Sequence, residues 1–179
     1  MFPRYPRYLW RNTQPKINVI QTPPLRVLSD YQIKIIKDSW EILNKHPVES
    51  GQAIFYTFLK RYPEHKKRYP AFRNMTLEEL KDTPQIRHHC SRIMEFFGAA
   101  IDSLGTEQQR DILVTALSDN ADYHGKKGIT KEHFIQMRDV MLEVISGACK
   151  LDDEEKKAWS DLMDIMYHIT FNVLDALNK

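Results

Sequence analysis

Apolar residues recur at helical spacing along the chain from Leu28 onward, and no segment of useful length alternates between apolar and polar residues. Spacings of three and four residues place side chains on one face of an α-helix, whereas alternation would indicate a strand. Only six of the 179 residues are glycine, which suits long helices better than a turn-rich sheet. The sequence therefore predicts an all-α domain.

Capping residues mark where the predicted helices begin and end. Ser29 and Gln32 form a capping box, in which a hydroxyl and an amide each satisfy a backbone N–H that the helix leaves free. Thr83 before Pro84 marks another start, and Gly105 supplies a stop. The predicted helices span residues 29–43, 48–62, 83–104, 106–124, 130–148 and 151–177, with short segments over 63–69 and from 76.

The first 27 residues differ in composition from the rest of the chain. They hold five basic residues, no acidic residue and five of the nine prolines. Because proline breaks helices, we expect a flexible basic arm over 1–27 and a single domain over 28–179. The arginines give the arm some likeness to an organellar transit peptide, but its prolines and its lack of serine argue against one. A solvated tail is the simpler interpretation.

Composition also limits the class of protein. No run of 18 or more apolar residues occurs, so we expect no membrane-spanning helix. Cys90 and Cys149 do not make a disulfide framework and fit the reducing cytoplasm. We find no zinc spacing, phosphate-binding loop or nucleophile motif, and we expect no nucleic-acid partner.

Two of the seven histidines, His89 and His124, stand in apolar contexts on separate predicted helices. His89 shares a helix face with Ile93, and His124 ends its helix shortly before Gly128. Two imidazoles that project into one apolar slot would suit a flat, iron-bearing cofactor, because a neutral imidazole nitrogen is an axial ligand of haem iron. A lone histidine on an apolar face is more often a packed core residue, so the pair alone leaves both interpretations open.

Several short motifs follow one another along the chain. They are Trp40; Arg61-Tyr-Pro63-Glu; Tyr69-Pro-Ala-Phe72-Arg with Leu77-Glu-Glu-Leu80; Ile86-Arg-His-His89 with Arg92-Ile93; His124 with Gly128-Ile129 and His133-Phe134; and Ala148-Cys149-Lys-Leu151-Asp with Trp159. In this order they resemble a full-length globin over about residues 28–177, most similar to the intracellular haemoglobins of insects. The resemblance implies a globin fold around haem b, and reversible binding of dioxygen and of other diatomic gases such as CO and NO.

Carried over by position, the resemblance implies that His124 holds the iron on the proximal side of the haem and that His89 is the distal residue, facing the gas. It also implies that Phe55 and Ile93 are walls of the distal pocket and that Arg92 is a partner of a haem propionate. Phe134 would contact the ring from the proximal side.

The globin family also places a phenylalanine against the haem after a short helix that begins with proline. Six residues after Pro63 stands Tyr69, whereas a one-residue insertion would give Phe72. We favour Tyr69 near the ring edge with Phe72 packed beneath it, and a tyrosine there would add a hydroxyl to the pocket. Asn120, one turn before His124, replaces the leucine that the family prefers and would loosen or polarise the proximal side.

The resemblance favours an oxygen-binding haem protein, monomeric or homodimeric, in the cytoplasm. Whether His89 binds the iron when no gas is present stays open; an internal ligand would compete with the gas and lower its apparent affinity. A second interpretation is a haem-dependent redox enzyme (nitric oxide dioxygenase, nitrite reductase or weak peroxidase) that uses an external reductase. A third is a haem-free helical module that acts through its basic arm.

Overall fold

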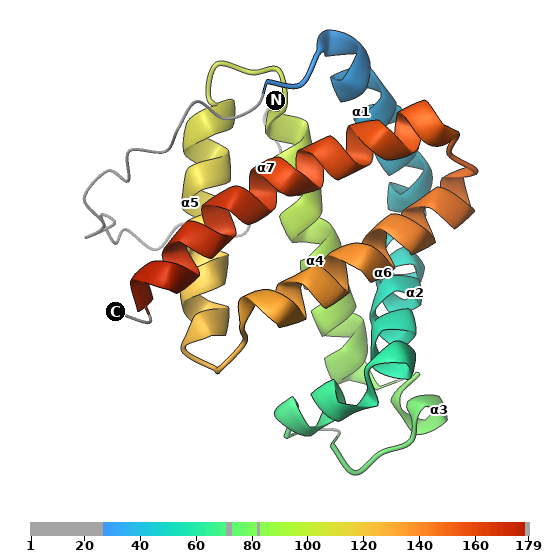
Figure 1. Ribbon diagram of the computed structural model, residues 1–179. Coiled ribbons are helices and arrows are strands. Elements are labelled where there is room, and N and C mark those ends of the chain that lie inside the picture. The colour runs from blue at the N-terminus through green and yellow to red at the C-terminus, as the bar shows by residue number, and fades with distance from the viewer. Residues whose placement is uncertain (1–26, 71–72, 82, 178–179) are drawn as a thin grey trace.

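The computed structural model describes residues 27–70, 73–81 and 83–177, which form helices joined by short connections (Figure 1). The helices are α1 (Asp30–Asn44), α2 (Pro47–Arg61), the 3₁₀ helix η2 (Pro63–Arg68), α3 (Leu77–Leu80), α4 (Pro84–Ser103), α5 (Gln109–Gly125), α6 (Lys131–Cys149) and α7 (Asp153–Leu177). No strand occurs in these ranges, so the prediction of an all-α fold is confirmed. Of the predicted arm only Val27 is described, so the division into arm and domain stays a prediction.

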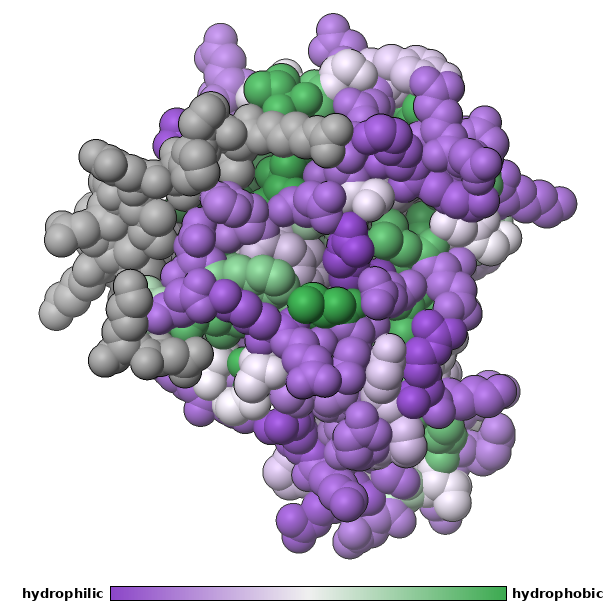
Figure 2. Space-filling view, viewed as in Figure 1, coloured by the Kyte–Doolittle hydropathy of each residue, from purple (hydrophilic) through white to green (hydrophobic). Residues whose placement is uncertain are grey.

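The helices are arranged in two crossed groups. In Figure 1, α6 and α7 run antiparallel across α1, α2, α4 and α5. Figure 2 shows that hydrophilic residues cover most of this face, with hydrophobic atoms in narrow strips between them. None of the described helices is both long enough and apolar enough to cross a membrane.

The predicted starts at Ser29, Thr76 and Thr83 are confirmed, because each hydroxyl accepts a backbone N–H from the first turn of its helix. The predicted start at Thr106 is wrong, and α5 begins at Gln109. The Thr106 hydroxyl instead donates to the Ser103 carbonyl, at 2.7 Å, and so satisfies the end of α4 rather than the start of α5. A single threonine between two helices can cap either one, and sequence spacing does not distinguish the two.

Two tryptophans join the first and last helices in the core. Trp40 on α1 and Trp159 on α7 are buried, and their ring centroids lie 6.2 Å apart. The Trp159 indole N–H donates to the Ser39 hydroxyl at 2.8 Å, so this buried donor is satisfied. Because a buried N–H without a partner destabilises a fold, the bond allows a large aromatic side chain to lie at the centre of the molecule.

Helices α2 and α4 approach most closely at Gly51. A Cβ atom at this position would lie 2.6 Å from the carbonyl oxygen of Cys90, closer than real Cβ atoms come, and 3.0 Å from the Cys90 Cβ. The backbone of α4 therefore lies directly against α2 at Cys90, the residue that follows His89. Only glycine permits this depth of packing.

The substitution Gly51→Ala tests the close approach. We expect it to lower the free energy of unfolding by about 1–3 kcal/mol, because the new methyl group meets backbone atoms that cannot move cheaply. Gly98→Ala is the matched control: its Cβ would lie 3.5 Å from the Trp40 indole nitrogen, an ordinary contact. There the gain in helix propensity should leave stability unchanged or raise it by up to about 1 kcal/mol. Urea unfolding measures both; equal effects would show that Gly51 is not special.

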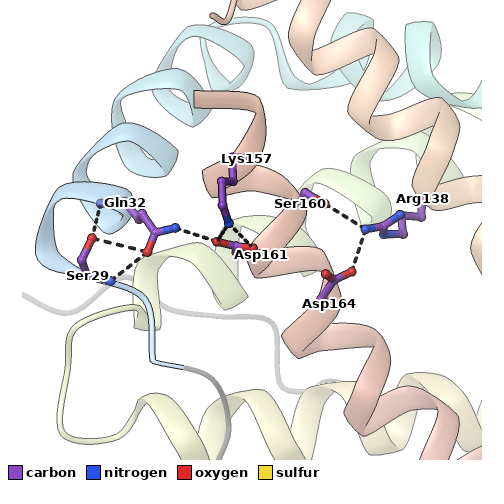
Figure 3. Close-up of polar contacts among 7 residues, drawn as sticks. All are labelled: Ser29, Gln32, Arg138, Lys157, Ser160, Asp161 and Asp164. Atoms are coloured by element: carbon purple, nitrogen blue, oxygen red, sulfur yellow. Dashed lines mark hydrogen bonds and ion pairs between the residues drawn. The ribbon is translucent and has the colours of Figure 1, made fainter. Parts of the chain in front are cut away.

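A buried carboxylate links α1 to α7 (Figure 3). Asp161 is only 4% exposed and accepts hydrogen bonds from Gln32 Nε2 and from Lys157 Nζ, both at 2.8 Å. The other end of the Gln32 amide, Oε1, accepts the backbone N–H of Ser29 at 3.1 Å. One glutamine thus caps α1 and fixes it to α7. Figure 3 also shows an exposed counterpart, in which Arg138 donates to Asp164 at 2.6 Å.

These two aspartates should differ in their contribution to stability. Asp161→Ala leaves the Gln32 amide without its buried acceptor, which should cost about 1–3 kcal/mol of unfolding free energy. Asp164→Ala removes a pair in which the carboxylate is 56% exposed, and such pairs contribute about 0–1 kcal/mol. Chemical denaturation of the two variants checks this, and a larger loss for Asp164→Ala would contradict it.

Candidate functional site

His89 on α4 lies among aromatic side chains. The centroid of its ring is 4.7 Å from that of Phe55 on α2 and 5.5 Å from that of Tyr69, which follows η2; both contacts are edge-to-face. Burial, and then the nearby imidazole of His124, lower the pKa of His89 to about 4. His89 is therefore neutral at physiological pH and lies close enough to His124 for the two rings to interact electrostatically.

His124 lies near the end of α5, with one ring nitrogen bound to its own helix. Its Nδ1 is 2.8 Å from the backbone carbonyl oxygen of Asn120. A carbonyl can only accept, so Nδ1 donates, and in the neutral ring Nε2 keeps its lone pair. Burial lowers the pKa of His124 and favours this neutral form. Because the acceptor is backbone, the bond does not depend on the asparagine side chain that departs from the family pattern.

Two cations lie at the edge between α4 and α5. Lys127 after α5 and then Arg92 on α4 lower the pKa of the Tyr123 hydroxyl, because both cations lie close enough to stabilise its ionised form. The Lys127 ammonium also lies 4.3 Å from the centre of the Tyr123 ring. Of these three residues, only Arg92 was predicted from the sequence. Only their positions in the sequence could have indicated the other two: Tyr123 directly precedes His124, and Lys127 follows it by three residues.

The other predicted residues divide between the two histidines. On the His89 side, Phe55 is fully buried, and its ring centroid lies 5.4 Å from that of Tyr69. Ile93 packs against the apolar cluster that contains Phe55. The Phe134 ring lies 5.9 Å from that of His124. Phe72 lies outside the described residues. Of the two candidates for the haem-facing aromatic position, Tyr69 is therefore the one with a described contact to His89.

This donor set fits a haem better than a bare metal ion. Among the described residues, no three side chains of the types that bind metals come together. Haem brings the four nitrogens of its own ring, so it needs only one or two ligands from the protein. The fold offers two neutral imidazoles, an apolar aromatic surround for the ring, and two cations for its carboxylates.

Comparisons with known proteins agree with this chemistry. The family model described as Globin matches residues 52–170. Globin CTT-X of Chironomus thummi thummi is 29% identical over 154 residues, which cover 86% of this chain and 99% of that protein. Two solved structures are similar: the hexa-coordinate haemoglobin of Drosophila melanogaster (TM-score 0.78, 32% identity, 80% of this chain and 94% of that one) and haemoglobin component TA-VII of Tokunagayusurika akamusi (TM-score 0.76, 28% identity, 84% and 99%).

The matched family model covers most of the described helices, and the similar structures share their arrangement over nearly their whole length. The chain therefore belongs to the globin family, is related to the insect haemoglobins, and is a haem protein that binds oxygen.

Proposed function

We propose that this protein binds dioxygen reversibly on haem b, with His124 as the proximal iron ligand and His89 as the distal residue. The observation that carries the proposal is the hydrogen bond from His124 Nδ1 to the Asn120 carbonyl. It orients the imidazole and leaves Nε2 as the nitrogen available to iron, as second-shell bonds do at metal-binding histidines.

When bound, haem would supply an iron that His124 would hold and that can also bind a gas. Phe55, Tyr69 and Ile93 keep bulk water away from the gas. Burial raises the pKa of Tyr69 to about 12, so its hydroxyl stays protonated and can only add a neutral dipole. On the proximal side, we propose that Phe134 packs against the ring.

The carboxylates of the haem need cationic partners at the edge of the site. Arg92 is the propionate partner that the sequence predicts, and we propose Lys127 as the second, because both lie beside Tyr123. Tyr123 is 48% exposed, which places this group where a carboxylate can remain partly hydrated. Pairs of this kind orient the ring and limit its rotation.

We also propose that His89 binds the iron when no gas is present. Its neutral ring is available as a ligand, and the similar Drosophila protein is described as hexa-coordinate. An internal ligand reduces the apparent gas affinity by the fraction of open protein. This would suit sensing or redox work with an external reductase at least as well as oxygen storage or transport.

Two free cysteines among the described residues fit the cytoplasm, where we place the protein. We propose a monomer or homodimer, with residues 1–27 as an arm on a globin domain formed by 28–179.

The role of His124 is tested by His124→Ala. We expect the variant to retain much less haem than the native protein after gel filtration, because it lacks the imidazole that the Asn120 carbonyl orients and that we propose binds the iron. The haem-to-protein ratio from the Soret and 280 nm absorbances measures this. His168→Ala, at an exposed histidine of α7, is the control and should bind haem normally. Equal haem content in both variants would contradict the proposal.

The role of His89 is tested by His89→Leu in the ferrous protein without gas. The native protein should show sharp, split visible bands that carbon monoxide displaces, and the variant a single broad band. The reason is that leucine fills the same apolar site and offers no lone pair to the iron. Visible absorption after reduction with dithionite measures the change. A native spectrum that already has one broad band, or a variant spectrum that does not change, would exclude the internal ligand.

A further inference from the structure

A second pair of histidines lies beside the proposed haem site. His65 on η2 is only 5% exposed and stacks on Phe58, with ring centroids 4.8 Å apart. Its Nε2 lies 2.6 Å from Oε1 of Gln136 on α6. Because an amide oxygen can only accept, Nε2 is the protonated nitrogen and donates. The buried imidazole thus joins η2 to α6.

The partner of His65 is His133 on α6, which occupies an unusual position in a helix cap. Its Nδ1 accepts the backbone N–H of Thr130 at 3.1 Å and lies 2.6 Å from the Thr130 hydroxyl. In most capping boxes glutamate or glutamine fills this role, and both remain acceptors at neutral and mildly acidic pH. A histidine does not: protonation places a hydrogen on Nδ1 and converts the acceptor into a donor.

The two rings meet edge-to-face, with centroids 4.6 Å apart. Arg68 of η2 also comes close to the connection that precedes α6. Its guanidinium lies 3.4 Å from the position that a Cβ on Gly128 would occupy. On one side of these contacts, η2 leads into Tyr69. On the other, the connection from His124 leads through Gly128 into α6 and Phe134. The contacts therefore join the distal and proximal walls of the proposed site.

The surroundings of His133 disfavour its protonated form. Burial, and then the positive charges of Arg68 and of His65 when protonated, lower its pKa, while the carboxylates of Glu132 and Glu64 oppose the shift. His133 is only half-buried, so a proton can reach it without unfolding of the chain.

We propose that His65 and His133 form a pH-sensitive clamp between η2 and the start of α6. With both rings neutral, the cap of α6 is complete and the rings are in contact. Mild acid protonates His133, which removes the acceptor for the Thr130 backbone N–H and places a charge beside Arg68 and His65, so the start of α6 loosens from η2. The consequence for gas binding rests on the proposed function, since it requires the haem to lie between Tyr69 and Phe134.

The expected direction follows from proton linkage. A histidine whose pKa is lower in the folded than in the unfolded protein binds fewer protons when folded. Its contribution to stability is therefore complete above the unfolded pKa, about 6.5, and is lost as the pH falls through the folded pKa. The clamp should hold at neutral pH and open in acid.

The test compares the thermal unfolding midpoint of the full-length haem-loaded protein with that of His133→Gln between about pH 7.5 and 5.5. Glutamine keeps the acceptor for Thr130 but does not titrate, so this variant should fold normally. We expect the native protein to lose about 2–4 °C more than His133→Gln over this range, the shift expected from one helix cap in a chain of this length. His168→Gln, which removes an exposed histidine, should follow the native curve.

Parallel curves for the native protein and His133→Gln would overturn the clamp. The unfolding measurement does not depend on which residues bind iron, so it separates the two proposals. If His124→Ala retains haem while the difference in midpoint persists, the clamp stands and the haem assignment fails. If the haem assignment holds, the rate of carbon monoxide binding should also vary less with pH in His133→Gln than in the native protein, and an equal dependence would count against the coupling.

Discussion

The contact of α2 with α4 at Gly51 is the constraint on which the candidate site depends. Because the two backbones touch there, α4 lies deep enough for His89 to enter an aromatic group that α2 itself contributes through Phe55. A larger residue at position 51 would push α4 outward by at least part of the van der Waals overlap. The side of the site that holds His89 thus depends on the absence of a β-carbon at position 51 more than on any polar interaction.

Keeping two imidazoles neutral inside the fold has an energetic cost that the structure distributes unevenly. His124 offsets part of it with a hydrogen bond to its own helix, whereas His89 has aromatic neighbours, and burial lowers the pKa of both rings. The low pKa of His89 and the availability of its neutral ring nitrogen therefore both follow from its burial.

Much of the fold follows from local rules, which explains why it could be predicted from the sequence. Helix starts with a hydroxyl and a following proline or glutamine are determined within one turn, and periodic apolar residues show which face is buried. The predicted helix start at Thr106 is wrong because its hydroxyl can either donate to a carbonyl at the end of α4 or accept an N–H at the start of α5, and the choice depends on tertiary structure. The role of His133 as a cap was missed for a different reason: the pattern used to find such caps specifies an acid or an amide.

The candidate site shows the same division between local and long-range information. His89, Phe55 and Tyr69 are each recognisable by position in a family pattern, but only the folded chain shows that the three rings meet. Tyr123 and Lys127 have no distinctive pattern, since an exposed tyrosine and a lysine are common on any helix. Their positions next to His124 are the one local signal, and their proximity to Arg92, from a helix about thirty residues earlier, is visible only in the folded chain.

The double use of Gln32 has a consequence for anything that the first residues of the chain contact. By capping α1 and bonding to Asp161, it holds the start of α1 against α7, so the chain enters the helical part at a fixed place. In Figure 1 this place lies at the end of the molecule away from η2 and α3, whereas His89 lies in the early turns of α4, close to them. A partner that binds at Val27 and the first turn of α1 would therefore lie at the opposite end of the molecule from His89, and the two surfaces could be occupied at the same time.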